Sequence, residues 1–153
     1  MRLLDFAAKA CAIAAGVLLT LITAMTCVSV FSRHVFEASL VGDFELTGVA
    51  TGVAIALSLP LCQLRRGNII VDFFTSRMAI SQKQFLDRLG NLALALVMML
   101  LAWRTALGGI NAWGNHSGSM LLGFPDWVVY WSMVPAFVLT AWIALWQCTQ
   151  RQP

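Results

Sequence analysis

Four long apolar stretches dominate the pattern of hydrophobic and polar positions along this chain. They cover residues 10–31, 46–64, 89–113 and 127–146, and only Arg104 places a charge inside one of them. A bilayer core of about 30 Å takes roughly 20 apolar residues in a helix. The pattern therefore predicts an all-α membrane protein with four transmembrane helices, and we expect residues 1–153 to form a single four-span membrane domain.

Basic residues are distributed unevenly among the connectors. Arg33 and Arg104 fall on one predicted side of the membrane. The other side, shared by both termini and the central loop, carries Arg2, Lys9, Arg65, Arg66, Arg77, Lys83, Arg88 and Arg151. Cytoplasmic loops retain Lys and Arg, so we expect both termini to be cytoplasmic. The net charge of +3 is then a topology signal, and we expect no nucleic-acid binding.

The central connector contains an amphipathic pattern at residues 68–79. Apolar residues fall on one helical face, and polar residues oppose them. The apolar residues are Ile69, Ile70, Phe73, Phe74 and Met78, and the polar ones are Asp72, Thr75 and Ser76. We predict an interfacial helix between the second and third spans. It either braces the bundle against a neighbour or is a connector that touches lipid.

Small residues recur at every fourth position in three of the apolar stretches. Close backbone approach holds helices together in lipid, so these stripes predict helix contacts. The stripes are Ala12, Gly16, Thr20 and Ala24; Gly48, Gly52 and Ala56; and Ser132, Ala136, Thr140 and Ala144. We single out Gly16, Gly48, Gly52 and Ala136 as packing residues. Their partner is either another helix of this chain or another protein.

Short motifs surround the apolar stretches in a recognisable order. Arg33 follows the first stretch, Glu45 starts the second, and Arg65-Arg66-Gly67-Asn68-Ile69-Ile70-Val71-Asp72 follows it. Over nearly its whole length the chain resembles the small, Q-type (DctQ-like) membrane subunit of tripartite ATP-independent periplasmic (TRAP) transporters. The matching positions make Arg65, Arg66, Gly67 and Asp72 a candidate cytoplasmic motif.

This resemblance implies a place in the bacterial inner membrane and in a sodium-coupled uptake system for organic acids. In that family a periplasmic binding protein captures the substrate and a large membrane subunit moves it. The resemblance implies that the small subunit is a scaffold, which enlarges the membrane footprint of the large subunit and helps to dock the binding protein. Its partners would then be these two proteins and the lipid bilayer.

The residues themselves also argue against independent transport. An ion-coupled transporter usually holds ionisable groups near the bilayer midplane, yet the four apolar stretches contain no carboxylate. Asn91 and scattered Ser and Thr hydroxyls could coordinate sodium, but such groups more often bond to neighbouring helices or to their own backbone, so we do not expect a complete sodium site. No His, Cys, Ser or acid constellation has catalytic or metal-ligand spacing, so we expect no enzymatic activity, metal or cofactor.

Arg104 lies nearer the outer end of its stretch than the middle. It either snorkels outward or pairs with Glu45, Asp43 or Glu37, which fall on the same predicted side. With Arg33 this arrangement forms a candidate outer charge cluster of Arg33, Glu45 and Arg104. Such a cluster would stabilise assembly.

Two other functions fit four short spans. A membrane anchor of a respiratory enzyme would hold haem between His34 and His116, although both lie in polar surroundings near helix ends. A small multidrug exporter would need a proton-linked carboxylate inside the membrane, which this sequence lacks. Both are therefore weaker interpretations than the transporter subunit.

Overall fold

The computed structural model describes residues 2–36, 42–65 and 80–149, and these ranges are almost entirely helical. The helices are α1 (Arg2–Phe36), α2 (Asp43–Leu64), α4 (Ile80–Gly114) and α5 (Asp126–Thr149). All four are long and apolar enough to cross a membrane, which confirms the predicted all-helical, four-span class. The described ranges contain no strand, only one isolated bridge between Gly118 and Pro125. The interfacial helix predicted at residues 68–79 lies outside the described residues.

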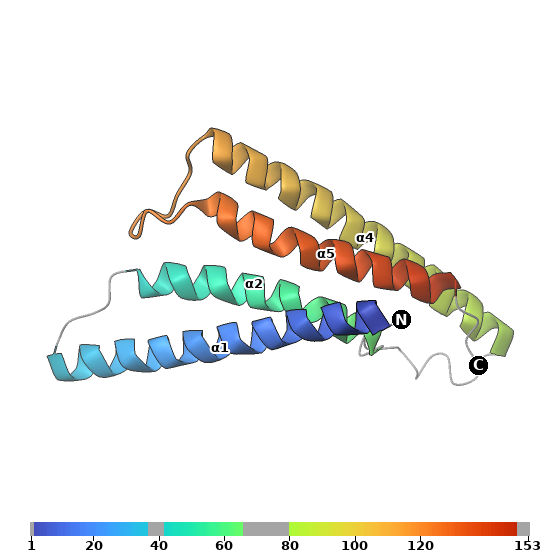
Figure 1. Cartoon of the computed structure of the whole chain (residues 1–153), viewed down its shortest axis with the longest axis horizontal. Coiled ribbons are helices and arrows are strands. Elements are labelled where there is room, and N and C mark those ends of the chain that lie inside the picture. Colours follow the sequence, from blue (N-terminus) through green and yellow to red (C-terminus); the bar gives the residue numbers. More distant parts are fainter. Residues whose placement is uncertain (1, 37–41, 66–79, 150–153) are drawn as a thin grey trace.

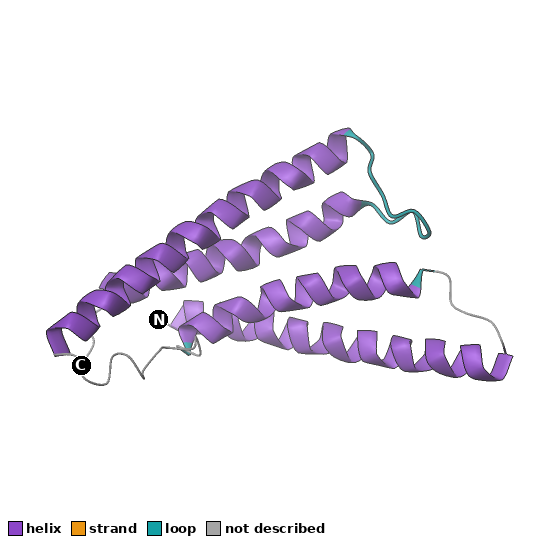
Figure 2. Ribbon diagram, turned by 180° about the vertical axis from the view of Figure 1, so that it is seen from behind, coloured by secondary structure: helices purple, strands orange, loops and turns teal. Residues whose placement is uncertain are grey.

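The helices form two antiparallel pairs, α1 with α2 and α4 with α5, which meet mainly through α2 and α5. Both described chain ends lie at one end of the bundle, which we call the terminal end (Figure 1). The α1–α2 and α4–α5 connections lie at the opposite end, the loop end. The two pairs draw together toward the terminal end and diverge toward the loop end, as the view from behind also shows (Figure 2).

A seven-residue repeat explains how α1 packs on α2. Ala8, Ala15, Ile22 and Ser29 are buried or half-buried. The residues between them that share this face are Cys11, Leu18, Met25 and Ser32, all half-buried. Spacing of three and four residues keeps one seam against a neighbouring helix. The rest of α1 exposes apolar side chains such as Phe6, Ile13, Leu21 and Phe31, as a lipid-facing helix does.

Small residues allow α4 and α5 to approach closely. Ala95, Ala102 and Gly109 are buried at seven-residue spacing on α4, and Ala136, Thr140 and Ala144 are buried on α5. A Cβ on Gly109 would lie 3.2 Å from the Trp131 ring. The Trp131 side chain of α5 therefore lies directly against the α4 backbone at Gly109. Close contacts of this kind hold helices together in lipid.

We expect Gly109→Ala to be less stable than the matched variant Gly90→Ala by about 1–2 kcal/mol, because the added methyl group must push Trp131 away. Gly90 is on the same helix, and no described atom lies within 4 Å of its Cβ position. Both changes gain the same intrinsic helix propensity. The difference between their free energies of unfolding therefore reports the contact between Gly109 and Trp131. Unfolding in mixed detergent micelles, followed by circular dichroism, measures it. Equal stability would show that α4 and α5 do not need this close approach.

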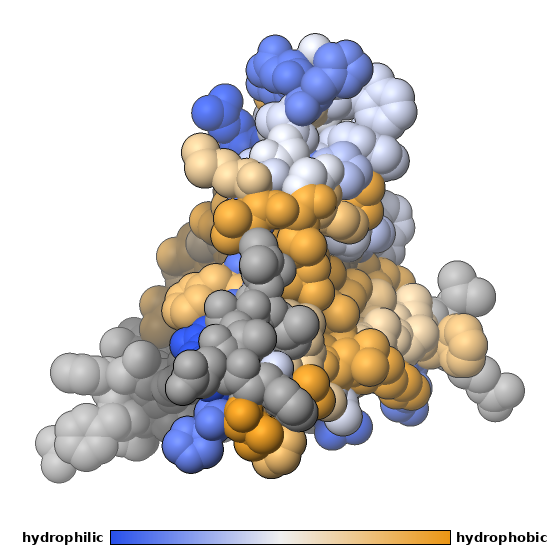
Figure 3. Space-filling view, turned by 90° about the vertical axis from the view of Figure 1, so that its left-hand side faces the viewer, coloured by the Kyte–Doolittle hydropathy of each residue, from blue (hydrophilic) through white to orange (hydrophobic). Residues whose placement is uncertain are grey.

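The loop end has surfaces of two kinds. Viewed from that side, hydrophilic surface gathers where α4 ends, and hydrophobic surface covers the middle of the face (Figure 3). Exposed apolar residues of the α4–α5 turn include Met120, Leu121, Leu122 and Phe124. The part of the turn at residues 120–124 is therefore largely apolar.

Candidate functional site

Glu45 joins two parts of the chain that are far apart in sequence. Its Oε2 and Oε1 atoms accept a hydrogen bond from the Leu121 backbone N–H, at 3.2 and 3.3 Å. The Ser119 hydroxyl also hydrogen-bonds to this carboxylate. Because Glu45 is in the first turn of α2 and its partners are in the α4–α5 turn, this contact links the two helix pairs. We call it the loop-end junction.

The α4–α5 turn has a backbone that suits it to this contact. The Ser119 N–H donates to the Phe124 carbonyl at 2.9 Å, and the Gly123 N–H donates to the Ser119 carbonyl at 3.1 Å. Gly123 has a φ of 62°, a conformation that glycine adopts without steric cost. The Leu122 N–H donates to the Ser119 hydroxyl at 3.2 Å. These bonds close a tight turn that leaves the Leu121 N–H to donate to Glu45 of α2.

Gly42 completes the loop-end junction by close packing. It precedes α2 with a φ of 87°, and a Cβ at this position would lie 2.6 Å from Leu122 Cγ. The turn therefore rests directly on the backbone that starts α2. Only glycine meets both requirements, the left-handed conformation and the lack of a side chain.

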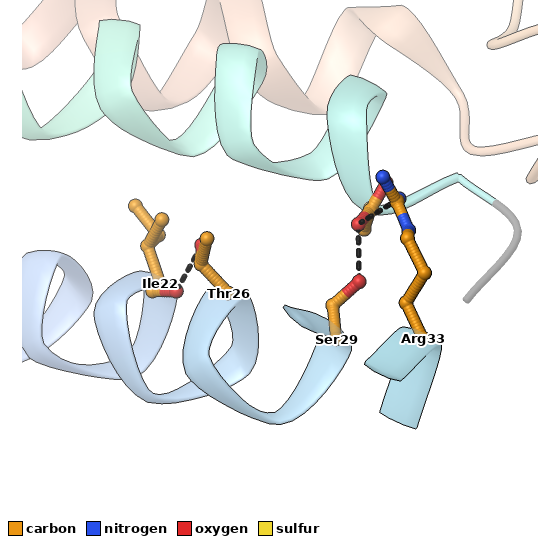
Figure 4. Close-up of polar contacts among 5 residues, drawn as sticks. Ile22, Thr26, Ser29 and Arg33 are labelled. Carbon is orange, nitrogen blue, oxygen red and sulfur yellow. Dashed lines mark hydrogen bonds and ion pairs between the residues drawn. The ribbon is translucent and has the colours of Figure 1, made fainter. Parts of the chain in front are cut away.

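Arg33 and Ser29 of α1 both reach the start of α2 (Figure 4). The Ser29 hydroxyl donates to Asp43, and Arg33 Nη2 lies 3.9 Å from Asp43 Oδ2. The Asp43 side chain is only 18% exposed, whereas that of Arg33 is 59% exposed. A buried serine therefore makes the closer contact, and the arginine adds a looser, solvent-screened pair.

The members of the candidate outer charge cluster have different partners in the structure. Arg33 pairs with Asp43, Glu45 bonds to the α4–α5 turn, and Arg104 is exposed. Arg104 makes no ion pair with any carboxylate in the described part of the chain. Glu37, one of its predicted partners, lies outside the described residues. The described residues thus show two separate contacts rather than one cluster, and a role of these residues in assembly stays a prediction.

Buried amides connect the helix pairs at the terminal end. Gln63 Nε2 of α2 donates to Gln147 Oε1 of α5 at 2.8 Å and to Asn91 Oδ1 of α4 at 3.1 Å. Gln147 Nε2 donates in turn to the Gln63 carbonyl at 2.9 Å. Gln63 is 2% exposed and Gln147 is 4% exposed. We call this set of amides the terminal-end clasp.

The other predicted residues are distributed as follows. A Cβ on Gly52 would lie 3.1 Å from Met133 of α5, and Ala136 is fully buried. Gly16 and Gly48 have no described atom within 4 Å of the Cβ position. Arg65 caps the end of α2, whereas Arg66, Gly67 and Asp72 of the cytoplasmic motif lie outside the described residues.

The histidines of the haem alternative do not form a binding site in the described structure. His34 and His116 are both exposed, and His116 is in a turn with a φ of 48°. Across residues 2–36, 42–65 and 80–149, no group of three or more His, Cys, Asp or Glu residues is arranged to hold a metal ion.

Comparison with known families decides the class of this protein. The family model for tripartite ATP-independent periplasmic transporters, DctQ component, matches residues 22–152. The chain belongs to the DctQ family. It is the small membrane component of a TRAP transporter and a multi-pass inner-membrane protein, so the resemblance found in the sequence is confirmed. Searches among curated proteins and among solved structures found no significant match.

The DctQ family works in a tripartite transporter with a large membrane subunit and a periplasmic binding protein. In this DctQ-family chain, the loop-end junction and the terminal-end clasp hold the helix pairs together at opposite ends. The clasp was not predicted from the sequence. One signal was available, because Gln63 and Gln147 are the only amide side chains in α2 and α5, and isolated polar residues in membrane helices usually bond across helices.

Proposed function

We propose that this DctQ-family chain is a fixed scaffold in a sodium-coupled importer of organic acids, and that it does not itself carry substrate. The family match over residues 22–152 carries the proposal. The arrangement of carboxylates supports it. In the described ranges these groups occur only near helix ends, at Asp5, Asp43, Glu45, Asp87 and Asp126. Coupling ions and substrate are then left to the large subunit.

The two inter-pair contacts support the fixed character of the scaffold. The terminal-end clasp joins α2, α4 and α5, and the loop-end junction joins α2 to the α4–α5 turn. A frame held at both ends resists relative movement of the helix pairs. This rigidity suits a subunit against which a larger neighbour moves.

We propose that the open glycines contribute to the contact with the large subunit. Gly16 is near the middle of α1 and Gly48 is in the second turn of α2. Neither packs against a described residue of this chain, and a bare helix backbone permits close approach of another helix. The exposed apolar face of α1 surrounds Gly16, with Ile13 and Val17 beside it.

We propose that the loop end faces the periplasm and that both termini are cytoplasmic. The excess of Lys and Arg at the terminal end supports this orientation, since Lys9, Arg65 and Arg88 belong to that end. The exposed apolar turn at Met120 and Leu121 would then lie on the side of the binding protein. It would form part of the docking surface.

We expect Glu45→Gln to weaken recovery of the complex from membranes. The carboxylate accepts the Leu121 N–H as a charge-assisted bond, about twice as strong as its neutral counterpart, so the variant turn is less firmly oriented. Copurification with a tagged large subunit in mild detergent measures the effect. Asp5→Asn is the matched control, because Asp5 pairs only with exposed Lys9 in its own helix. Equal recovery of both variants and unchanged uptake would contradict a role for Glu45 in assembly.

Reconstitution into liposomes tests the scaffold proposal as a whole. The large subunit, the binding protein and this chain together should take up an organic acid when a sodium gradient is imposed, and omission of this chain should abolish uptake. A Gly16→Ile variant should reduce recovery of the large subunit while the isolated chain stays folded. Uptake by this chain alone would overturn the proposal.

A further inference from the structure

An apolar groove lies between the two helix pairs, in the half of the spans nearer the loop end. Its volume is about 290 Å³. The walls come from α1, α2 and α5 and include Leu18, Leu46, Val49, Val53, Val128 and Val129. This is the part of the molecule where the pairs diverge (Figure 1). In a membrane such a groove opens to hydrocarbon rather than water, because the wall residues lie within the membrane-spanning helices.

The charged residues of the groove both belong to its loop-end side. Glu45, Ser119 and Asp126 line it there, and the lining contains no Lys or Arg. Glu45 and Asp126 are each in the first turn of a helix, so the two carboxylates lie at the depth of lipid headgroups. This arrangement attracts a cationic group and disfavours an anionic one.

The lining of the groove restricts its occupant. Apolar side chains from three helices form the walls, and the two carboxylates are confined to the loop-end side. A molecule with a hydrocarbon chain and a cationic head matches both parts of this lining. An empty apolar groove would also forgo dispersion contacts along all its walls.

We propose that this groove binds one acyl chain of phosphatidylethanolamine, with the ammonium group of the lipid near Glu45 and Asp126. The lipid fills the space where the helix pairs diverge and is held by apolar contact along the chain and by charge at the headgroup. Its binding rests only on the groove and is independent of the proposed scaffold role.

Native mass spectrometry tests the proposal on the full chain. The protein is released from nanodiscs that contain equal amounts of phosphatidylethanolamine and phosphatidylglycerol. We expect one retained phosphatidylethanolamine, which is lost in Ala50→Phe because Ala50 lines the groove. Ala24→Phe is the matched control, since Ala24 is exposed on α1 and does not line the groove. Equal lipid retention in both variants would overturn the proposal.

A second variant separates headgroup from chain recognition. Asp126→Asn should reduce severalfold the preference for phosphatidylethanolamine over phosphatidylglycerol while the chain is still bound. No initial preference, or a protein dimer in place of the lipid adduct, would overturn the assignment. A photoreactive acyl chain supplies a readout on the unaltered protein. Crosslinks should concentrate at residues 46–53 and 128–132, and crosslinks spread evenly over all four helices would mean ordinary surrounding lipid.

Discussion

Gln147→Leu is expected to lower the free energy of unfolding by about 1–3 kcal/mol, because it removes two buried interhelical hydrogen bonds. One bond connects the Gln63 side chain to Gln147 Oε1, and the other connects Gln147 Nε2 to the Gln63 carbonyl. That carbonyl is in the last turn of α2. Leucine fills a volume similar to that of glutamine. The loss of stability therefore reports the missing hydrogen bonds rather than a cavity.

Unfolding by titration of a harsh detergent into mixed micelles, monitored by circular dichroism, measures this loss. Thr149→Val is the control, since Thr149 is exposed and bonds only to the Trp146 carbonyl of its own helix. A double-mutant cycle with Gln63→Leu isolates the interaction, and we expect the double variant to lose less than the sum of the single variants. A Gln147→Leu protein as stable as the control would show that the clasp contributes nothing to stability.

Gly42→Ala is expected to lower the free energy of unfolding by about 1–3 kcal/mol, since it forces a side chain into a left-handed conformation. The new Cβ would also lie 2.6 Å from Leu122 Cγ, so the α4–α5 turn must move away from α2. Displacement of the turn should in turn lengthen the bond between Glu45 and the Leu121 N–H. We therefore expect both lower stability and weaker recovery of the complex.

Gly48→Ala is the matched control for the stability of the isolated chain. It makes the same chemical change six residues further along, at a helical position with no described atom within 4 Å of its Cβ. In the double variant Gly42→Ala/Leu122→Ala the clash with the Leu122 side chain is removed, so part of the lost stability should return. The cost of the left-handed backbone at residue 42 should remain. The same detergent titration compares all three proteins. A Gly42→Ala protein as stable as Gly48→Ala would show that the turn does not rest on α2 as described.

The contacts that join the helix pairs could be predicted only in part. Glu45 was identified through family resemblance. Asp43 was predicted only as one possible partner of Arg104. The structure instead pairs Asp43 with Ser29 and Arg33, and Glu45 with a backbone N–H. Charged residues in a sequence suggest ion pairs between opposite charges. They do not indicate that a turn donates a backbone N–H to a carboxylate 76 residues away.

The packing residues show the same division. A stripe of small residues predicts that a helix is approached closely. In this chain a Cβ on Gly52 would lie 3.1 Å from Met133, and Ala136 is fully buried. Gly16 and Gly48 carry the same pattern but have open space beside them. The stripe has the same sequence signature whether the neighbouring helix belongs to this chain or to another protein. Only the arrangement of the helices distinguishes the two cases.

By itself the sequence determined the helical class, the four spans and the family. These follow from local properties, because the bilayer requires about 20 apolar residues per span and short motifs keep their order around the spans. The tertiary structure decided which helices pair, that Gln63, Asn91 and Gln147 form a clasp, and that a groove opens near Glu45. These features depend on contacts between residues that are distant in sequence. Lipid and helix surfaces are equally apolar, so the bilayer gives no hydrophobic driving force that would favour one helix contact over another.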